Sequence, residues 1–284
     1  MNRIDIRASA ASKNPNLLKW VPRFVWNWLA RFIHERELNE ILERGQSMTG
    51  LEFSQFSLDY LGTALQISGL EHIPSQEPCI VAANHPLGGL DGLALIAAIG
   101  KKRSDCKIIV NDLLLAVEPM KQHFIGVNKF GQSARQQLKD IEKEYASPQV
   151  MALFPSGFVS RVFEGKIQDI RWTKAFISKA KQYHKPIIPC FIEGRNSPRF
   201  YHLAVWRKRL GIQTNIEMLT LPDEMTKQKG KTIHIRFGPA IHPEQLDTRQ
   251  SDQQWADKVR DYVYTLKKED NPPFTAKLFF KSEP

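Results

Sequence analysis

A histidine and an aspartate share the segment IVAANHPLGGLDGLALI, residues 80–96. An apolar run typical of a buried strand ends just before His85, and Asp91 opens a second apolar run of helical composition. A carboxylate that accepts a hydrogen bond from one imidazole nitrogen fixes the tautomer and leaves the other nitrogen as a base. Gly88 and Gly89 allow a tight turn between the two side chains. The segment therefore indicates a general-base pair, and an N-capping aspartate beside an incidental loop histidine is the alternative.

Alternating strands and helices are expected to position this pair. Runs rich in Val and Ile with Pro or Gly boundaries predict strands, and apolar residues at helical spacing predict the intervening helices. This alternation predicts an α/β fold with a mostly parallel or mixed central sheet flanked by helices, and with sites after the carboxyl ends of strands. The expected strands are 78–84, 106–110, 124–127, 150–155, 186–192, 214–219 and 232–238, and the expected helices lie near 91–100, 132–146, 171–183 and 252–268.

The segment 16–45 is expected to add an amino-terminal amphipathic helical element. Its apolar residues recur at helical spacing from Leu17 to Ile33, and the basic residues Arg23 and Arg31 lie between them. Tryptophan beside basic residues suits a helix that lies in a lipid interface. A stripe of this kind more often packs on the protein core, so both interpretations stay open.

Composition and charge restrict the partner and the compartment. The net charge of +10 and the pI of about 9.5 favour an anionic partner: nucleic acid, an anionic membrane surface or an acidic carrier protein. The polar first residues lack the apolar core of a secretory signal, and no apolar run approaches the roughly 20 residues that span a bilayer. Cys79, Cys106 and Cys190 have no metal-like spacing and predict buried free thiols in a reducing compartment. We therefore expect a cytoplasmic protein, peripheral on the inner face of the cytoplasmic membrane.

The segment NHPLGGLDG resembles the His/Asp signature of the glycerolipid O-acyltransferases, the lysophosphatidate acyltransferase family. Most members have H-x-x-x-x-D, whereas the pattern H-x-x-x-x-x-D from His85 to Asp91 is similar to a bacterial hemolysin-like branch. That branch includes acyltransferases that complete ornithine and glycine lipids. Three further blocks follow in the family's order: FIGVNKFG (124–131), LFPSGFVSR (153–161) and KPIIPCFIEGRNS (185–197). Four ordered blocks are far more specific than any one of them.

The resemblance covers roughly residues 65–240. It implies an acyltransferase domain over 65–284, and the Trp-rich, basic pattern before it predicts a helical membrane-docking region over 1–64. The implied reaction moves a fatty acyl group from an acyl thioester to the hydroxyl of a lyso-lipid, with His85 as the base and Asp91 orienting it. No metal and no cofactor are implied, and the co-substrate is acyl carrier protein thioester or acyl-CoA. The residues expected to bind substrate are Asn84, Gly88, Gly89, Lys129, Ser156, Gly157, Arg161, Glu193, Arg195 and Asn196.

The third block departs from the family pattern F-P-E-G-T-R-S. Ser156 replaces the glutamate, and the arginine is displaced to Arg161. Because the resemblance implies that the glutamate–arginine pair binds glycerol phosphate, a lyso-aminolipid (ornithine or glycine lipid) is expected in preference to lysophosphatidate. Ser156 is not expected to be a hydrolase nucleophile, since Phe154 occupies the place of the first glycine of a nucleophile elbow. Ser156 and Gly157 either bind an oxyanion or head group, or form a plain turn.

Charged residues in and after the fourth block leave alternatives open. Arg195 can hold a carboxylate or phosphate through two parallel hydrogen bonds, or it can pair with Glu193. The segment RFYHLAVWRKRLG (199–211) interleaves aromatic and basic residues. With an acyltransferase signature upstream, this suits a membrane or carrier-protein surface, and a solvated face is the alternative.

Three other classes of protein are weighed against the acyltransferase. A non-catalytic lipid-binding module on the same scaffold is disfavoured by the intact His85 and Asp91. Charge alone suggests a nucleic-acid binder, but no recognition motif supports one, so no nucleic-acid partner is expected. An esterase lacks the elbow serine. The expected partners are the acyl donor, a lyso-lipid acceptor and an anionic membrane surface.

Overall fold

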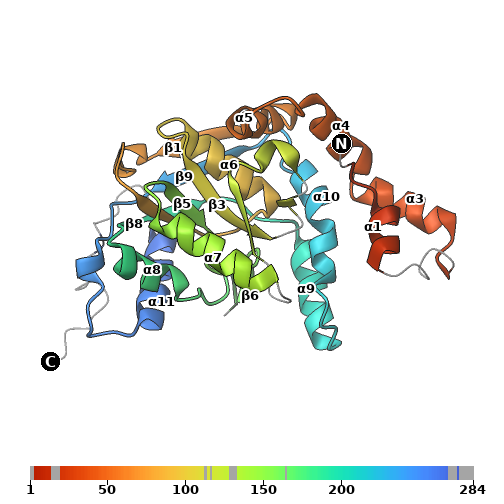
Figure 1. Cartoon of the computed structure of the whole chain (residues 1–284). Coiled ribbons are helices and arrows are strands. Elements are labelled where there is room, and N and C mark those ends of the chain that lie inside the picture. Colours follow the sequence, from red (N-terminus) through yellow and green to blue (C-terminus); the bar gives the residue numbers. More distant parts are fainter. Residues whose placement is uncertain are drawn as a thin grey trace.

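The computed structural model describes residues 3–13, 20–111, 114–115, 117–127, 133–163, 165–267 and 274. A seven-stranded sheet lies at the centre of the fold, in the order β1-β9-β8-β2-β5-β3-β4, and β6 and β7 form a separate hairpin (Figure 1). The strands are β1 (Ala64–Ser68), β2 (Cys79–Ala83), β3 (Cys106–Asn111), β4 (Phe124–Val127), β5 (Val150–Leu153), β6 (Arg161–Phe163), β7 (Lys166–Gln168), β8 (Ile187–Ile192) and β9 (Thr232–Phe237).

The sheet is mixed and mostly parallel, as the alternation of strands and helices predicts. β8, β2, β5, β3 and β4 run parallel to one another, β9 is antiparallel to β8, and β1 is parallel to β9. The central strands β2, β5 and β8 are buried along their whole length. Their continuous apolar sequences follow from this burial, since helices cover both faces of a parallel sheet. Cys79, Cys106 and Cys190 lie in the sheet as buried free thiols, as predicted.

Helices cover both faces of the sheet (Figure 1). The α-helices are α1 (Ile6–Lys13), α3 (Arg23–Phe32), α4 (Glu35–Arg44), α5 (Gly50–Tyr60), α6 (Gly89–Gly100), α7 (Ser133–Ala146), α8 (Ala175–Tyr183), α9 (Pro198–Arg209), α10 (Leu221–Thr226) and α11 (Asp252–Thr265), and the 3₁₀ helices are η1 (Leu70–His72), η3 (Glu118–Met120), η4 (Ile216–Thr220) and η5 (Pro243–Gln245). On one face, Val81 and Ala83 of β2 join an apolar cluster with α5 and α6. On the other, Ile80 and Ala82 join a cluster with α8 and α11. The alternating side chains of β2 therefore bind both helical layers to the sheet.

The segment 214–219 is not the strand that its sequence predicts. Most of it forms η4, which leads directly into α10. Glu217 in η4 is fully buried, with its carboxylate against the guanidinium groups of Arg161 and Arg207. Local β propensity carries no information about such contacts between distant segments. Pro222, in addition, favours the first turn of a helix. The sequence patterns also miss α9 and the edge strand β1.

The amino-terminal element is helical, as predicted, but it is broken in two. α3 ends before His34, which has a left-handed backbone with a φ of 54°, and α4 follows. The apolar stripe is divided, because Ile33 at its end is buried whereas Trp20, Phe24 and Trp28 are 83%, 72% and 59% exposed, and Trp26, which lies off the stripe, is buried as well. α1 and α3 lie at one edge of the molecule, away from the sheet (Figure 1). None of the helices in the described ranges combines the length and the apolar character needed to cross a membrane.

α5 connects the amino-terminal region to the rest of the fold. It starts with a capping box in which Glu52 accepts the N–H and the hydroxyl of Thr49. Its Phe53 and Leu58 belong to the same apolar cluster as α6. The domain boundary expected at residue 64 stays a prediction, and α5 on its amino-terminal side is part of the core.

Candidate active site

His85 and Asp91 form a hydrogen-bonded pair just beyond the carboxyl end of the central strand β2. Nδ1 of His85 lies 2.9 Å from Oδ2 of Asp91. The same carboxylate oxygen accepts the backbone N–H groups of Leu87 at 2.7 Å and Gly88 at 3.0 Å. Asp91 therefore caps the start of α6 and contacts the imidazole at the same time, and the role of the pair as a general base stays a prediction.

The turn between the two side chains requires glycine. Gly88 has a φ of 89°, a conformation that favours glycine, and a Cβ there would lie 3.0 Å from the side chain of Leu221. α6 begins at the next residue, Gly89, which is exposed. The backbone N–H of Gly89 has no hydrogen-bond partner among the described residues. The turn thus brings an open helix N-terminus close to His85.

Phe154 packs against one face of the imidazole. Its ring stacks on that of His85 with the centroids 4.0 Å apart and an angle of 12° between the planes.

The contact with Asp91 assigns the proton of neutral His85 to Nδ1 and leaves Nε2 as the basic nitrogen. Nε2 has no hydrogen-bond partner within the part of the chain that the structure describes, and 18% of the side chain is exposed. This nitrogen is therefore available to a substrate.

Burial gives Asp91 an unusual electrostatic environment. Burial raises the pKa of Asp91 above its ordinary value, and the hydrogen bonds from His85, Leu87 and Gly88 oppose that rise. Oδ1 of Asp91 is buried without a hydrogen-bond partner among the described residues, so the donors converge on Oδ2. A buried carboxylate gains most from an adjacent imidazole when that imidazole is protonated. Asp91 thus stabilises a protonated imidazole, the form that His85 takes when it accepts a proton as a general base.

Ser156 and Gly157 of the third block form a tight turn. The hydroxyl of Ser156 donates to the carbonyl of Phe158 at 2.6 Å. The N–H of Gly157 donates to the carbonyl of Phe154 at 2.9 Å, and Gly157 has a φ of 64°. Both donors are used inside the turn, as the plain-turn alternative expects. A part in substrate binding stays a prediction for these two residues.

Arg161 belongs to a buried ion cluster. Its guanidinium donates to the carbonyl of Val159 at 2.7 Å and lies 3.1 Å from Oε1 of Glu217. It also lies over the ring of Phe200, 4.5 Å from the centroid, and burial lowers the pKa of Arg161. Arg207 of α9 lies 2.8 Å from the other oxygen of Glu217. These contacts connect the third block to α9 and η4, and a role of Arg161 in acceptor binding stays a prediction.

The two asparagines of the predicted site hold strands and loops together. The side-chain amide of Asn84 exchanges two hydrogen bonds with the backbone of Ile192, at 2.9 and 2.7 Å, which joins β2 to β8. Nδ2 of Asn196 donates to the carbonyl of Pro86 at 3.2 Å. The fourth block therefore reaches the His85 loop directly, and substrate contacts of both asparagines stay predictions.

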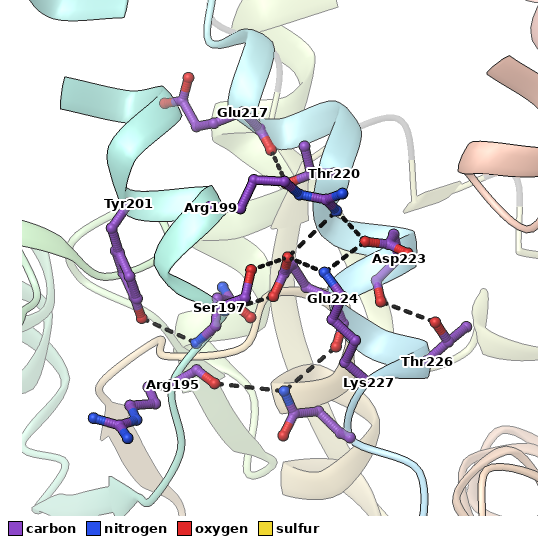
Figure 2. Close-up of polar contacts among 12 residues, drawn as sticks. Arg195, Ser197, Arg199, Tyr201, Glu217, Thr220, Asp223, Glu224, Thr226 and Lys227 are labelled. Carbon is purple, nitrogen blue, oxygen red and sulfur yellow. Dashed lines mark hydrogen bonds and ion pairs between the residues drawn. The ribbon is translucent and has the colours of Figure 1, made fainter. Parts of the chain in front are cut away.

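Glu193 and Arg195 do not pair with each other. Glu193 lies 3.3 Å from Nη1 of Arg236 on β9. Arg195 is exposed, and only its backbone carbonyl has a partner in the described part of the chain, Nε2 of Gln228 at 3.4 Å. Figure 2 shows the guanidinium of Arg195 turned away from the neighbouring polar side chains. Among the described residues, the guanidinium of Arg195 is therefore an exposed cation without a partner.

A polar cluster on α9 and α10 anchors the fourth-block loop (Figure 2). The fully buried Glu224 accepts the N–H of Ser197 at 2.6 Å and its hydroxyl at 2.7 Å. Lys227 lies 2.9 Å from Glu224 and 2.7 Å from Asp223, which Arg199 also contacts. Burial raises the pKa of Glu224, but the hydrogen bonds from Ser197 and Lys227 outweigh it and hold this pKa below its ordinary value. The cluster fixes the loop without using the side chain of Arg195.

Two buried residues beside His85 are not predicted from the sequence. Oδ1 of Asp169 accepts the N–H of His85 at 3.2 Å, and the N–H of Ser160 donates to the carbonyl of His85 at 2.7 Å. Ser160 falls within the third block without a distinguishing pattern, and Asp169 lies outside all four blocks.

Lys129, predicted from the second block, lies outside the described residues.

The fold and the His/Asp pair agree with the family that the sequence motifs predict. A family model described as "Acyltransferase" matches residues 8–271, so the chain belongs to this acyltransferase family. The solved 1-acyl-sn-glycerophosphate (LPA) acyltransferase PlsC from Thermotoga maritima has the same fold, with a TM-score of 0.52 and 15% identity. The alignment covers 86% of this chain and 97% of PlsC.

Curated relatives match over nearly the whole chain. The lyso-glycine lipid O-acyltransferase of Phocaeicola vulgatus is 38% identical over 264 residues, which are 93% of this chain and 95% of that protein. The protein of the same name from Bacteroides thetaiotaomicron is 36% identical, over 93% of this chain and 97% of that protein.

Proposed function

We propose that this acyltransferase moves a fatty acyl group from an acyl thioester to the hydroxyl of a lyso-glycine lipid. The observation that carries the proposal is the hydrogen-bonded pair of His85 and Asp91, in which Nε2 of His85 has no partner among the described residues. The two relatives named for lyso-glycine lipid support the acceptor, since they match almost end to end. Ser156 in place of the family's glutamate agrees with an acceptor that carries no phosphate.

His85 acts as a general base in the proposed reaction. Its Nε2 takes the proton of the acceptor hydroxyl while that oxygen attacks the carbonyl carbon of the thioester. Asp91 stabilises the imidazolium through the Nδ1 hydrogen bond. The tetrahedral intermediate then expels the thiolate, which receives the proton from His85 as the C–S bond breaks. The product ester forms on the acceptor, and no acyl group is attached to the enzyme.

We propose that the N–H of Gly89 stabilises the oxyanion of that intermediate. The N–H of Gly88 is held by Asp91, and the N–H of Gly157 is held by the carbonyl of Phe154. The N–H of Gly89 has no partner among the described residues, and it lies at the positive end of the α6 dipole. A donor of this kind acts most strongly where charge develops in the transition state.

The proposed donor is the thioester of acyl carrier protein or of coenzyme A. Both carriers are anionic, which suits the net charge of +10. The thioester already contains an activated acyl group, so the proposed transfer needs no metal and no cofactor. Measuring thiol release with each donor in turn distinguishes the two.

A panel of acceptors tests the proposed function. Purified protein is given an acyl thioester with lyso-glycine lipid, lyso-ornithine lipid or lysophosphatidate, and the diacylated product is quantified. We expect the highest kcat/KM with lyso-glycine lipid. Preference for lysophosphatidate would shift the assignment to a 1-acylglycerol-3-phosphate acyltransferase. Absence of product from all three, with both donors, would leave only a non-catalytic lipid-binding module on this scaffold.

We propose that Arg195 binds the carboxylate of the glycine head group. Its guanidinium is exposed and has no ion pair within the described residues, and arginine binds carboxylates through two parallel hydrogen bonds. Arg195→Gln is expected to raise the KM for lyso-glycine lipid by about ten-fold or more, since hydrogen bonds to charged groups contribute about 1.5–3 kcal/mol. Steady-state kinetics in mixed micelles should show kcat little changed. Arg171→Gln, which removes an exposed arginine paired with Asp257, serves as the matched control, and an equal KM in both variants would exclude this role.

Exposed aromatic residues on α3 and just before it suit docking on an anionic membrane surface. Trp20, Phe24 and Trp28 are largely exposed, and Arg23 and Arg31 beside them are exposed as well. Large apolar side chains on a monomer surface mark an interaction site when they gather together. Tryptophan and basic residues together fit the boundary between lipid head groups and acyl chains.

The carboxyl end of α9 presents a second surface of the same character. Trp206 and Leu210 are 60% and 67% exposed, and Lys208 between them is exposed. Arg199 at the start of α9 lies over the ring of Phe32 in α3, 5.0 Å from its centroid, so the two helices are neighbours. We propose that both surfaces contact the inner face of the cytoplasmic membrane, from which the acceptor is drawn.

The triple variant Trp20→Ser, Phe24→Ser, Trp28→Ser is expected to lose most of its binding to anionic vesicles. Each apolar side chain that is fully buried in lipid contributes roughly 1.5–3 kcal/mol to the free energy of membrane binding. Binding of the triple variant should therefore weaken by at least about ten-fold. The residual binding should fall further at high salt, because basic residues supply it. Co-sedimentation with vesicles containing anionic lipid measures both effects. Leu138→Ser, an exposed leucine on α7, is the control, and binding equal to that of this control would remove the docking role.

A further inference from the structure

His85 is held through its main chain as well as through its ring. Its N–H donates to Oδ1 of Asp169 at 3.2 Å, and its carbonyl accepts the N–H of Ser160 at 2.7 Å. Asp169 and Ser160 are buried, with 0% and 2% of their surfaces exposed. Both polar groups of the His85 main chain are therefore fixed by two residues that the sequence motifs do not identify.

Ser160 and Asp169 are also bound to each other. The hydroxyl of Ser160 lies 2.6 Å from Oδ1 of Asp169 and 3.3 Å from the carbonyl of His85. A hydroxyl has one hydrogen, and the shorter distance assigns it to the carboxylate. The other carboxylate oxygen, Oδ2, accepts Nε1 of Trp172 at 2.9 Å. Asp169 thus acts as the acceptor at the centre of a hydrogen-bond network that includes the His85 main chain.

α11 holds Asp169 from the opposite side. The N–H of Asp169 donates to the hydroxyl oxygen of Tyr264 at 2.7 Å, and Nη2 of Arg260 donates to the carbonyl of Asp169 at 2.7 Å. Tyr264 and Arg260 belong to α11, which lies against the sheet in the second apolar cluster. The main chain of His85 is therefore connected, through Asp169, to a helix of the core.

The β6–β7 hairpin explains how residues so far from His85 in the sequence reach it. Ser160 directly precedes β6, and Asp169 directly follows β7. The antiparallel pairing of the two strands places Arg161 opposite Gln168, so the two ends of the hairpin lie side by side. Both ends meet at His85.

Both carboxylate oxygens of Asp169 are needed as acceptors. An amide keeps one oxygen for the N–H of His85 and the hydroxyl of Ser160, but its NH2 group cannot accept Nε1–H of Trp172. A buried carboxylate without a cation is costly. No lysine or arginine pairs with the Asp169 carboxylate in the described ranges. Burial raises the pKa of Asp169, whereas the hydrogen bonds of Ser160 and Trp172 and the charge of His85 lower it. The charged group that Asp169 interacts with is thus the proposed base itself.

We propose that Asp169 and Ser160 are positioning residues that keep Nε2 of His85 aligned with the acceptor hydroxyl. The inference rests on the proposed role of His85 as the base. The imidazole is attached to the main chain of His85 through Cβ. A shift of that main chain therefore displaces Nε2, even while Asp91 still contacts Nδ1. A displacement of about 1 Å at a reacting group lowers rates by roughly 10²-fold.

Asp169→Asn and Ser160→Ala test this inference. Each is expected to lower kcat by roughly 10- to 100-fold, with the KM of donor and acceptor little changed and with a cooperative thermal melt retained. Asp257→Asn, on the exposed face of α11, is the matched control and should have wild-type kcat. In a His85→Ala background, Asp169→Asn should cause no further loss, because the residue acts only through His85.

Two outcomes would overturn the inference while the proposed function stands. One is wild-type kcat in both Ser160→Ala and Asp169→Asn. The other is an activity loss of the same factor with and without His85, which would reveal a general structural role. Ser160→Ala removes only a hydroxyl group, so it gives the answer even where Asp169→Asn does not fold. Failure of the wild-type protein to transfer acyl groups in the same assay would instead contradict the proposed function.

Discussion

Replacing His85 with alanine should lower the rate of acyl transfer by at least about two orders of magnitude, because a positioned general base contributes roughly 10²–10⁴. Nε2 of His85 is the basic nitrogen of the pair, and alanine provides no atom that can take the acceptor proton. The loss should appear in kcat, since the proton moves only in the transition state. Thiol release from an acyl thioester, measured on purified protein with acceptor in mixed micelles, gives the rate directly.

The fold should survive this substitution. The hydrogen bonds from the His85 main chain to Asp169 and Ser160 do not need the imidazole. His184→Asn is a matched control, because His184 is exposed and has a φ of 50°, a backbone conformation that asparagine tolerates. The control should melt and react like the wild type. Transfer by His85→Ala at the rate of this control would refute the assignment of His85 as the base.

The contact between His85 and Asp91 was predictable because it is local. His85 and Asp91 are separated by one turn, and the glycines and the apolar run after them specify where that turn ends and α6 begins. The strand before the pair was equally legible, since β2 is buried on both faces and its sequence is apolar throughout. A strand–turn–helix unit with a capping carboxylate requires no knowledge of the rest of the chain.

The surroundings of the pair were not predictable, because distant segments provide them. Asp169 and Ser160 reach His85 only through the β6–β7 hairpin, whose strands are three residues each. Glu217 lies in a segment whose local pattern favours a strand, yet two arginines from elsewhere in the chain surround its carboxylate. Periodicity and propensity contain no information on such long-range contacts.

The amphipathic amino-terminal segment shows a different limit of prediction from sequence. Helical spacing places Trp20, Phe24 and Trp28 on a common stripe, and the same spacing is expected whether a stripe meets lipid or protein. In the structure these three aromatic residues are exposed, whereas Trp26, which lies off that stripe, is buried with its Nε1 donating to the carbonyl of Val21. The choice depends on where α3 lies relative to the sheet, which its own sequence does not specify.

Asp91→Asn should lower kcat by about 10²- to 10⁴-fold while the KM values stay close to those of the wild type. Asparagine keeps an oxygen that can accept the N–H groups of Leu87 and Gly88, so the turn into α6 should persist. What is lost is the negative charge that stabilises the imidazolium of His85. The amide nitrogen takes the place of Oδ1, which is buried without a partner among the described residues, so a loss of about 1–3 kcal/mol in the free energy of unfolding should accompany the change.

The double variant His85→Ala, Asp91→Asn separates a catalytic carboxylate from a purely capping one. A carboxylate that acts through His85 has nothing to act on in the His85→Ala background, so the double variant should be as slow as His85→Ala alone. Its melting temperature should still fall, because the amide nitrogen is buried without an acceptor in both backgrounds. A wild-type kcat for Asp91→Asn, together with the lowered melting temperature, would mean that Asp91 only caps α6 and that the imidazole works without it.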